Sequence, residues 1–413
     1  MMDKKIDCLV LGGGAGGLAA AAEAARHGAS VVLLDREPAP GGVLDQCIHH
    51  GFGVHRYREE LTGPEFAHRL VTELERSGAE FLGKRFASLV DVKRRRVSTL
   101  GPSGYIHFQP SRVILATGAR ERPFGALGVP GFRPSGILTA GVAQRMVNVD
   151  GLLPGRRTII LGSGDIGLIM ARRLHLEGVE VVAVLEQRAI AGGLTRNVVQ
   201  CLDDFEIPLL LQHTVSCVHG TSRLEGVTVG EVDRQGVLIP GTEQYMAADT
   251  LVLSVGLIPD NELVSGLVPT DKATGGLRVN SQMKTEIDWL YAAGNNVIIY
   301  DLADWVARAG ETAGQFAAQA ALGESPPPDS VPLETGANIV HMVPTALADT
   351  NAACLLLRVS EPIANGSLQI EGLKPRPVAR ARPSEMIEVE LSEEEISELC
   401  KRERILVEIV SHD

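Results

Sequence analysis

The hydrophobic and polar positions of the chain form one arrangement that occurs twice, about 150 residues apart. In each copy a short apolar run leads into a glycine-rich turn, an apolar helical stretch and a second apolar run that ends in an acidic residue. The first copy runs from Cys8 to Asp35 and the second from Thr158 to Glu186. Short apolar runs bounded by glycine are typical of buried strands, and the longer stretch between them is typical of a helix. Both copies therefore predict strand, turn, helix and strand.

The glycines of the two turns predict a phosphate-binding role. Each turn reads G-x-G-x-x-G directly after a strand, which lets backbone N–H groups approach a pyrophosphate. The first glycine permits the sharp exit from the strand, the second leaves room for the phosphate, and the third lets the helix pack closely on the sheet. The helix N-terminus adds unpaired N–H donors and a partial positive charge. The predicted contacts are Gly12, Gly14, Ala15, Gly16 and Gly17 in the first copy and Gly162, Gly164, Asp165, Ile166 and Gly167 in the second.

The acid that ends each copy predicts a contact with a ribose. Glu186 follows Gly162 by 24 residues, and Asp35 stands at the matching place in the first copy. A carboxylate at this position accepts hydrogen bonds from ribose hydroxyls, so two dinucleotides are implied. We predict that Asp35, with its neighbour Arg36, binds the first of them. Because a carboxylate repels a 2′-phosphate, Glu186 favours NADH over NADPH, and Arg188 moderates this preference.

Outside the two copies, the pattern predicts antiparallel strands, one helix and a separate C-terminal module. Residues 86–110 and 223–250 alternate apolar and polar positions around glycines, as hairpins do. Residues 310–322 form an alanine-rich stretch that predicts a helix. The proline-rich segment 325–329 predicts an extended linker. It precedes four strand-like stretches that predict a small β-sandwich, which is either a folded cap or a docking module for a partner subunit.

Composition and charge narrow the class of protein. The length of 413 residues suggests two or three domains, and 45% hydrophobic with 22% charged residues is close to the average for globular proteins. Lys and Arg number 39 against 51 Asp and Glu, and the resulting net charge of −12 disfavours nucleic-acid binding. We expect no membrane span, because no sufficiently long apolar run occurs. Six cysteines without C-x-x-C spacing predict reduced thiols in a cytoplasmic protein and no metal site.

With its two copies, the sequence resembles the two-dinucleotide-binding flavoproteins, the superfamily that contains thioredoxin reductase and glutathione reductase. Residues 114–120, 253–259 and 290–295 look like the crossing from the FAD domain, the return from the NAD domain and the last FAD contact before a long helix. The helix predicted over 310–322 would then direct its start, near Thr312, toward the flavin ring. The resemblance implies FAD and NAD as cofactors, with further contacts at Gly41, Gly42, Ala116, Thr117, Gly118, Gly256, Gly294, Asn295 and Thr312.

The same resemblance implies an α/β fold with two Rossmann-like, three-layer domains and a small C-terminal β-sandwich. One Rossmann-like domain is inserted in the other, so that the FAD domain is discontinuous in sequence. The expected boundaries are 1–122 and 260–325 for the FAD domain, 123–259 for the NAD domain, 326–332 for the proline linker and 333–413 for the C-terminal β domain.

Three stretches resemble narrower groups within that superfamily. Residues 116–123 look like the version found in flavoprotein subunits of hydrogen cyanide synthase, opine oxidase and sarcosine oxidase. Residues 41–53 and 59–65 look closer to flavoproteins associated with anaerobic glycerol-3-phosphate dehydrogenase systems. This resemblance implies an enzyme that relays electrons between NADH and a small molecule or a partner dehydrogenase subunit. We accordingly expect a homodimer or a hetero-oligomer.

Departures from the superfamily pattern limit what the resemblance implies. The disulfide that one branch carries just after Gly42, and the C-x-x-C that another carries in the NAD domain, are both missing, which disfavours disulfide reduction. Asn295 stands where most relatives have an aspartate, and its amide oxygen can still accept the same hydrogen bond. Cys47 and His49 are candidate catalytic residues on the substrate side of the flavin. In the alternative interpretation, Cys47 is a small buried apolar group and His49 belongs to a helix cap or an interface.

Three functions agree with these features. The first is an FAD-containing, NADH-linked oxidoreductase that works with a partner subunit. The second is a non-catalytic FAD electron-transfer subunit whose NAD-like site is vestigial or holds another nucleotide. The third is the α-like subunit of an amine or imino-acid oxidase. Anaerobic reduction of the flavin by NADH, or by such an amine, separates them.

Overall fold

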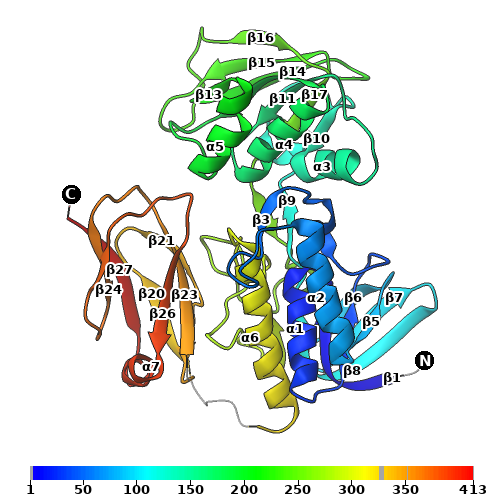
Figure 1. Ribbon diagram of the computed structural model, residues 1–413, viewed down its shortest axis with the longest axis vertical. Helices are drawn as coiled ribbons and strands as arrows, with labels where there is room; N and C mark the ends of the chain where they lie inside the picture. The colour runs from blue at the N-terminus through cyan, green and yellow to red at the C-terminus, as the bar shows by residue number, and fades with distance from the viewer. Residues whose placement is uncertain (1–2, 325–329, 351, 413) are drawn as a thin grey trace. The chain divides into compact units, whose positions relative to one another are not determined.

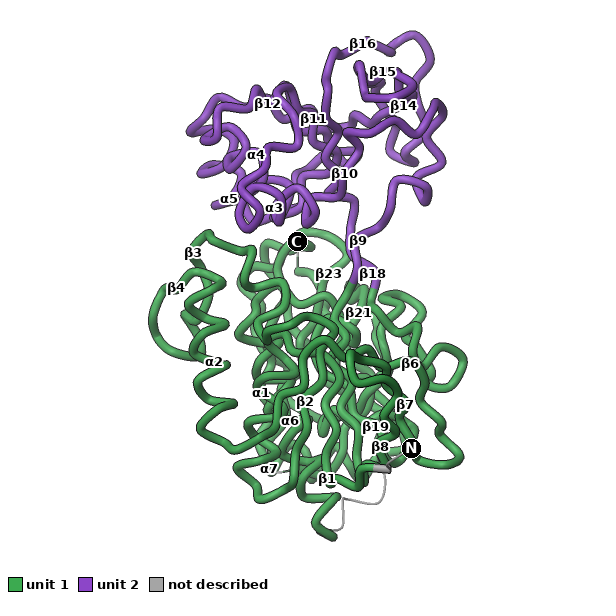
Figure 2. Tube along the Cα trace, turned by 90° about the vertical axis from the view of Figure 1, so that its right-hand side faces the viewer, with its two compact units in different colours: residues 1–119, 259–413 green, residues 120–258 purple. Residues whose placement is uncertain are grey.

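The computed structural model describes residues 3–324, 330–350 and 352–412. The chain forms two compact units, one of residues 1–119 with 259–413 and the other of residues 120–258 (Figure 2). Each unit contains a parallel sheet with helices packed on it (Figure 1).

A seven-stranded sheet forms the centre of the first unit. Its parallel part has the order β5-β2-β1-β8, with β19 also paired to β8, and β7 and β6 continue the sheet as antiparallel strands. Cys8, Leu9 and Val10 in β1 are fully buried, because strands of a covered parallel sheet are apolar on both faces. The strands are β1 (Asp3–Leu11), β2 (Val31–Leu34), β5 (Glu80–Leu82), β6 (Phe86–Asp91), β7 (Arg96–Gly101), β8 (Gly104–Leu115) and β19 (Leu290–Ala292).

Three helices accompany this sheet: α1 (Ala15–Arg26), α2 (Gly63–Ser77) and α6 (Ala303–Ala321). Helices α1 and α6 approach closely, since a Cβ on Gly310 would lie only 2.1 Å from the carbonyl oxygen of Gly16. Thr62 begins α2 with a capping box that Glu65 completes. A short hairpin of β3 (His50–Phe52) and β4 (Leu61–Thr62) and the 3-10 helix η1 (Gly42–Gln46) precede α2.

Helix α6 begins seven residues before the predicted start at residue 310. The predicted start was wrong because it rested on the alanine-rich stretch 310–322, and the helix extends beyond that stretch. In the structure Gly310 lies inside the helix, where the absence of a side chain permits the contact with α1. Residues 303–309 extend the helix toward its N-terminus and bury Ala307 in the core.

The second unit has a five-stranded parallel sheet in the order β10-β17-β11-β12-β13. Three antiparallel strands, β14-β15-β16, form a separate sheet, and the strands by which the chain enters and leaves the unit, β9 and β18, pair with each other. The strands are β9 (Ala119–Glu121), β10 (Ile137–Thr139), β11 (Arg157–Leu161), β12 (Glu180–Glu186), β13 (Leu209–Leu211), β14 (His213–His219), β15 (Gly226–Glu231), β16 (Gln244–Ala247), β17 (Thr250–Leu253) and β18 (Leu257–Pro259). The helices of this unit are α3 (Ala140–Asn148), α4 (Asp165–Leu176) and α5 (Thr195–Cys201), and its 3-10 helices are η2 (Phe124–Leu127) and η3 (Asp203–Phe205). A further 3-10 helix, η4 (Glu262–Val264), lies in the first unit.

The C-terminal part of the first unit consists of two sheets that share one apolar core. One sheet has the order β22-β20-β27-β24-β25 and the other β21-β23-β26. Leu347, Leu355 and Ile405 are fully buried between them. The elements are β20 (Ser330–Thr335), β21 (Ile339–Val343), β22 (Ala346–Ala348), β23 (Ala352–Val359), β24 (Gly366–Ile370), β25 (Arg376–Val378), β26 (Ile387–Ser392), α7 (Glu393–Leu399) and β27 (Ile405–Ser411).

The C-terminal module begins earlier than predicted. Residues 330–332, assigned to the linker, belong to β20, where Val331 is buried and pairs with Leu347. Buried and exposed positions alternate from Val331 to Glu334, as they do in a strand. The nearby prolines made this strand hard to recognise from the sequence. The proline segment 325–329 lies outside the described residues. Arg358 of β23 donates to Asp301, which also accepts from the backbone N–H of Met386 at 2.7 Å, so this module is held to the segment before α6.

The predicted fold class is confirmed: two units with parallel α/β sheets are accompanied by a two-sheet C-terminal module. The predicted hairpin region 86–110 forms the antiparallel strands β6 to β8, and the region 223–250 forms β15 and β16, which β14, before that region, extends to three strands. Among the described residues, no helix combines the length and the hydropathy that crossing a membrane requires.

Candidate functional site

The first glycine-rich turn joins β1 to α1. Gly12 has a left-handed φ of +111°, and a Cβ there would lie 2.2 Å from the carbonyl oxygen of Ala116. A Cβ on Gly17 would lie 1.8 Å from the carbonyl oxygen of Gly12. At Gly14, by contrast, a Cβ would meet no heavy atom of the protein within 4 Å. Gly12 and Gly17 are thus required for the turn itself, whereas the space in front of Gly14 is open to a ligand.

Asp35, at the end of β2, faces this turn. Its carboxylate accepts hydrogen bonds from the backbone N–H of Gly13 and, at 2.7 Å, from that of Glu37. A carboxylate has about four acceptor positions, so part of its capacity is available for ribose hydroxyls. The next side chain, Arg36, is exposed. Ala15 and Gly16 open α1 and are buried, which leaves their backbone N–H groups as the available donors.

Several residues that the resemblance assigned to the first cofactor lie against the same turn. The backbone N–H of Gly41 donates to the carbonyl oxygen of Gly13 at 2.9 Å, and a Cβ on Gly42 would lie 3.0 Å from the Cα of Gly14. The backbone N–H of Ala116 donates to Leu11 at the end of β1. Residues distant in sequence therefore meet at one edge of the sheet. Thr117 and Gly118 follow Ala116 and bond Asp260, where the chain returns to this unit.

The segment after β19 holds Gly294 and Asn295. Gly294 has a φ of +89°, and the side-chain oxygen of Asn295 accepts from the backbone N–H of Tyr300 at 3.2 Å. A cofactor hydroxyl would have to donate to the same oxygen as the Tyr300 N–H, and the second lone pair of this oxygen allows that. The neighbouring Asn296 is fully buried and donates to the carbonyl oxygen of Leu115 at 2.9 Å, an anchoring role that sequence reasoning missed.

Thr312 is placed differently from the prediction. Because α6 begins at Ala303, Thr312 lies in the third turn of the helix, and its hydroxyl donates to the carbonyl oxygen of Arg308. Its side chain lines a cavity between α6 and the C-terminal module. This placement gives no support to a contact between Thr312 and the flavin.

The second turn, between β11 and α4, has the same contacts as the first. Gly162 has a φ of +101°, and a Cβ there would lie 2.0 Å from the carbonyl oxygen of Ser254. A Cβ on Gly167 would lie 2.6 Å from the carbonyl oxygen of Gly162. At Gly164 the nearest heavy atom to a Cβ would be the Ser254 hydroxyl at 3.5 Å, an ordinary contact distance. Gly256, after Ser254, has a φ of +98°, as Gly118 does at the matching place of the first unit with +73°.

A second glycine pair completes this likeness. The backbone N–H of Gly193 donates to the carbonyl oxygen of Ser163 at 2.8 Å, just as that of Gly41 donates to Gly13. By this hydrogen bond Gly193 takes the place of Gly41, while by their interval from the acid Gly192 and Gly193 match Gly41 and Gly42; sequence reasoning missed this pair. The signal was present, since both pairs follow the acidic residue of their copy by a short interval.

Glu186 is buried and fully engaged by protein donors. One carboxylate oxygen accepts from the backbone N–H and the hydroxyl of Ser163, and the other accepts from the backbone N–H and the Nε of Arg188 at 3.0 and 3.2 Å. Burial alone would raise the pKa of Glu186, but these hydrogen bonds and the Arg188 charge lower it, so the group is a carboxylate near neutral pH. A ribose would replace the donor most easily moved, which is the exposed Arg188 side chain.

We expect Glu186→Ala to reduce the preference for NADH over NADPH by about tenfold, because one charge-assisted interaction of about 1.4 kcal/mol is lost. The same substitution frees Arg188 for a 2′-phosphate. Flavin reduction rates at varied NADH and NADPH concentrations measure this ratio. Glu180→Ala, at the other end of β12 and exposed, is the control and should leave it unchanged. An unchanged ratio in Glu186→Ala would refute the ribose assignment.

Asp165 and Ile166 open α4. The Asp165 carboxylate accepts from the backbone N–H of Leu194 at 2.9 Å and from the side-chain amide of Asn197 at 2.6 Å. Asp165 therefore ties α4 to the segment that begins α5. Ile166 is partly exposed, so both residues can present backbone N–H groups at the helix start.

Cys47 and His49 lie in the segment between η1 and β3. The Cys47 thiol donates to the carbonyl oxygen of Val43 at 3.3 Å, and burial, assisted by the Asp45 charge, raises its pKa to about 12. A thiol with this pKa is uncharged at neutral pH and is a weak nucleophile. The His49 ring packs near the ring of Phe52, with centroids 5.1 Å apart.

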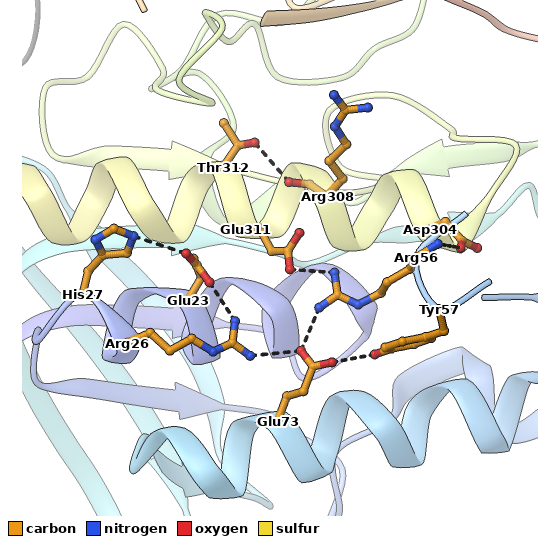
Figure 3. Close-up of polar contacts among 10 residues, drawn as sticks. All are labelled: Glu23, Arg26, His27, Arg56, Tyr57, Glu73, Asp304, Arg308, Glu311 and Thr312. Carbon is orange, nitrogen blue, oxygen red and sulfur yellow. Dashed lines mark hydrogen bonds and ion pairs between the residues drawn. The ribbon is translucent and has the colours of Figure 1, made fainter. Parts of the chain in front are cut away.

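The following loop is clamped to the start of α6 by Asp304 (Figure 3). The buried carboxylate accepts from three backbone N–H groups, those of Gly53, His55 and Arg56, at 2.9 to 3.1 Å. The Arg56 guanidinium then pairs with Glu311 of α6 and with Glu73 of α2. This loop is thereby held to two helices.

We expect Asp304→Ala to release this loop. Three N–H groups, one buried and two partly buried, lose their acceptor at a cost of about 1–3 kcal/mol for the buried one, so their hydrogen exchange should accelerate by at least about tenfold. Exchange at Gly53, His55 and Arg56, followed by mass spectrometry, measures the effect. Asp204→Ala, an exposed carboxylate, is the matched control and should exchange as the wild type does. Unchanged protection in Asp304→Ala would contradict the clamp.

Among the described residues, no group of three or more His, Cys, Asp or Glu side chains is arranged to hold a metal ion. The six cysteines are free thiols. The candidate site thus consists of two separate turns, each with open space before its second glycine and an acid at the end of the next strand. That arrangement fits one dinucleotide in each unit.

Comparison with known proteins gives relatives of both units. One subunit of the opine oxidase of Rhizobium meliloti is 27% identical over 76% of this chain and 62% of its own length. Thioredoxin reductase of Bacillus subtilis is 25% identical over 71% of this chain and 88% of its own length. The crystal structure of thioredoxin reductase from T. acidophilum has the same fold, with a TM-score of 0.64, 22% identity, and coverage of 78% of this chain and 100% of its own. The chain thus spans about three fifths of the opine oxidase polypeptide that it matches.

A family model, described as pyridine nucleotide-disulphide oxidoreductase, matches residues 6–318. The proteins of this family are oxidoreductases that bind FAD and NAD(P), which confirms the two predicted cofactors and the enzyme class. Since the match covers both turns and well over half of the chain, this protein belongs to the pyridine nucleotide-disulphide oxidoreductase family.

Proposed function

We propose that the chain is an FAD-dependent, NADH-linked oxidoreductase that passes a hydride between nicotinamide and flavin and works with a partner dehydrogenase subunit. The observation that carries the proposal is the pair of turns with equivalent contacts. The turn at Gly14, with Asp35, would hold FAD, and the turn at Gly164, with Glu186, would hold NADH. The proposal includes the domain boundaries that the resemblance implies.

FAD and the nicotinamide supply the redox chemistry when they are bound, so the chain has to bind and orient them. The starts of α1 and α4 offer backbone N–H groups and a positive dipole end to phosphates. Asp35 and Glu186 orient the riboses through hydrogen bonds. A neutral Cys47 thiol supports no nucleophilic role, and we propose Cys47 and His49 only as contacts on the substrate side.

The partner in this proposal is a dehydrogenase subunit of the glycerol-3-phosphate type. Its support is the resemblance of residues 41–53 and 59–65, which flank the loop that Asp304 holds in place. The free cysteines favour a cytoplasmic location. We propose a homodimer or hetero-oligomer as the working assembly.

The match to the opine oxidase polypeptide favours a second candidate function. That protein is by name one subunit of an oxidase, and its similarity extends over 76% of this chain. The alpha subunit of sarcosine oxidase from Rhizobium meliloti adds 30% identity over 61% of the chain. The second proposal is therefore an α-like subunit of an amine or imino-acid oxidase.

Anaerobic titration of the purified protein separates these proposals. NADH, NADPH, glycerol 3-phosphate and sarcosine are added in turn while the flavin absorbance is followed. Under the first proposal NADH bleaches the flavin, and NADPH does so less effectively. Bleaching by sarcosine and not by NADH would support the oxidase subunit. A flavin that none of these compounds reduces until a partner is added would support the electron-transfer subunit.

A further inference from the structure

The serine inside the second turn, Ser163, is bonded to the acid that ends the second copy. It stands between Gly162 and Gly164 and is fully buried. Its backbone N–H donates to one carboxylate oxygen of Glu186, Oε2, at 3.2 Å, and its hydroxyl donates to the same oxygen. Two donors from one residue therefore hold Oε2.

The same hydroxyl joins Glu186 to the segment that follows β12. The backbone N–H of Gly192 donates to the Ser163 hydroxyl oxygen at 2.8 Å, and that of Gly193 donates to the Ser163 carbonyl oxygen at 2.8 Å. A backbone N–H can only donate, and a hydroxyl has a single hydrogen. The hydroxyl hydrogen of Ser163 must therefore point to Glu186, so the direction of this hydrogen bond is fixed.

The other carboxylate oxygen of Glu186, Oε1, is the one that a ligand can reach. It accepts from the backbone N–H and the Nε of Arg188 at 3.0 and 3.2 Å. A carboxylate has about four acceptor positions, so these donors and the two of Ser163 fill it. The Arg188 side chain is 59% exposed and can move aside, whereas the backbone donors and the buried hydroxyl are held by the fold. Glu186 consequently offers one position, to one ribose hydroxyl.

The first turn does without this hydroxyl. Gly13 stands at the place of Ser163, and Asp35 accepts from the backbone N–H groups of Gly13 and Glu37. A glutamate side chain has one rotatable bond more than an aspartate and loses more conformational entropy when it is fixed. The hydroxyl thus occurs in the copy whose acid needs more support.

We propose that Ser163 is a positioning residue that sets the preference of the second turn for a nicotinamide dinucleotide without a 2′-phosphate. Its hydroxyl keeps Oε1 of Glu186 directed toward the ribose, where the negative charge repels a 2′-phosphate. Without the hydroxyl, Oε2 loses a donor and the Gly192 N–H loses its acceptor. The carboxylate can then rotate, which weakens the ribose contact and reduces the repulsion. This inference rests on the proposed function, because it takes the second turn as the NADH site.

Binding of NAD⁺ and NADP⁺ to the FAD-loaded protein, measured by calorimetry, tests the proposal without electron transfer. We expect Ser163→Ala to lower the preference for NAD⁺ by about fivefold or more, because a charge-assisted hydrogen bond is lost. Added to Glu186→Ala, the same substitution should change the ratio by less than about twofold, since Ser163 acts through Glu186. Ser216→Ala removes another hydroxyl of the same unit, one that donates to Thr228, and as the matched control should keep the wild-type ratio.

The kinetics of flavin reduction give a second measurement. The ribose that Glu186 would bind belongs to the adenosine half of the dinucleotide, away from the nicotinamide. Ser163→Ala should therefore raise the KM for NADH and leave the rate at saturating NADH unchanged. A serine that only stabilised the fold of the unit would not produce this separation of KM from kcat.

Three results would overturn the role of Ser163. The wild type binds NADP⁺ as tightly as NAD⁺, or Ser163→Ala keeps the wild-type ratio, or the substitution lowers the ratio equally with and without Glu186. Should Ser163→Ala fail to fold, Ser163→Gly decides, because the first turn already has glycine at this place, and this variant must lower the ratio in the same way. A wild type that binds neither nucleotide would contradict the proposed function itself, and this inference with it.

Discussion

Gly14→Val is expected to yield a folded protein that no longer retains FAD. The added side chain meets no protein atom at its Cβ, so the turn and the helix can form, but its branches occupy the space that a phosphate needs. The backbone at Gly14 has a φ of −79°, which valine adopts without strain. The ratio of flavin to protein after gel filtration should fall at least about tenfold, the equivalent of about 1.4 kcal/mol or more in binding.

Gly125→Val is the matched control for this experiment. A Cβ on Gly125 also meets no heavy atom within 4 Å, and its φ is not in the left-handed region. The control should keep both its fold and its flavin. Gly12→Ala gives the opposite comparison, because its Cβ would collide with the backbone of Ala116 and the fold itself should be lost. Full flavin loading of Gly14→Val would show that the first turn does not hold FAD.

Gly164→Val is expected to keep FAD and to lose its reduction by NADH. The substitution lies in the other unit, and its Cβ would come no closer than 3.5 Å to the Ser254 hydroxyl, so the second turn should still form. Its branches would displace the phosphates of NADH and lower the rate of anaerobic flavin bleaching at a fixed low NADH concentration by about 100-fold or more, the equivalent of about 2.7 kcal/mol.

Dithionite distinguishes this effect from damage to the flavin site, since a chemical reductant needs no nucleotide site and should bleach the variant fully. Gly125→Val serves again as the control within the same unit. If Gly164→Val were reduced by NADH at the wild-type rate, the second turn would not be the nicotinamide site. A wild-type protein that NADH never reduces would instead favour the electron-transfer or oxidase subunit.

The two turns could be predicted because their geometry is fixed locally. Gly12 and Gly162 need a left-handed φ, and Gly17 and Gly167 must touch the carbonyl oxygen of the first glycine. These requirements place glycine at fixed positions of the sequence, whatever the rest of the fold. The pairing of Gly13 with Asp35 follows from the same local strand–turn–helix–strand unit.

Contacts between distant segments were harder to predict. Gly192 and Gly193 were missed although their interval from Glu186 matches that of Gly41 and Gly42 from Asp35; the backbone hydrogen bond that ties such a pair to its turn appears only in the structure. The start of α6 was misplaced because the prediction rested on the alanine-rich stretch 310–322, and the helix extends beyond that stretch. Thr312, assigned from that start, faces the C-terminal module instead.

The sequence by itself determined two glycine-rich strand–turn–helix–strand units, the acid that ends each of them and the order of the α/β elements, because each depends on residues close together in the chain. Only the tertiary structure decided which side chains meet across the chain, such as Asp304 with the loop of Arg56. Such meetings depend on packing among segments tens to hundreds of residues apart, and no local pattern encodes them.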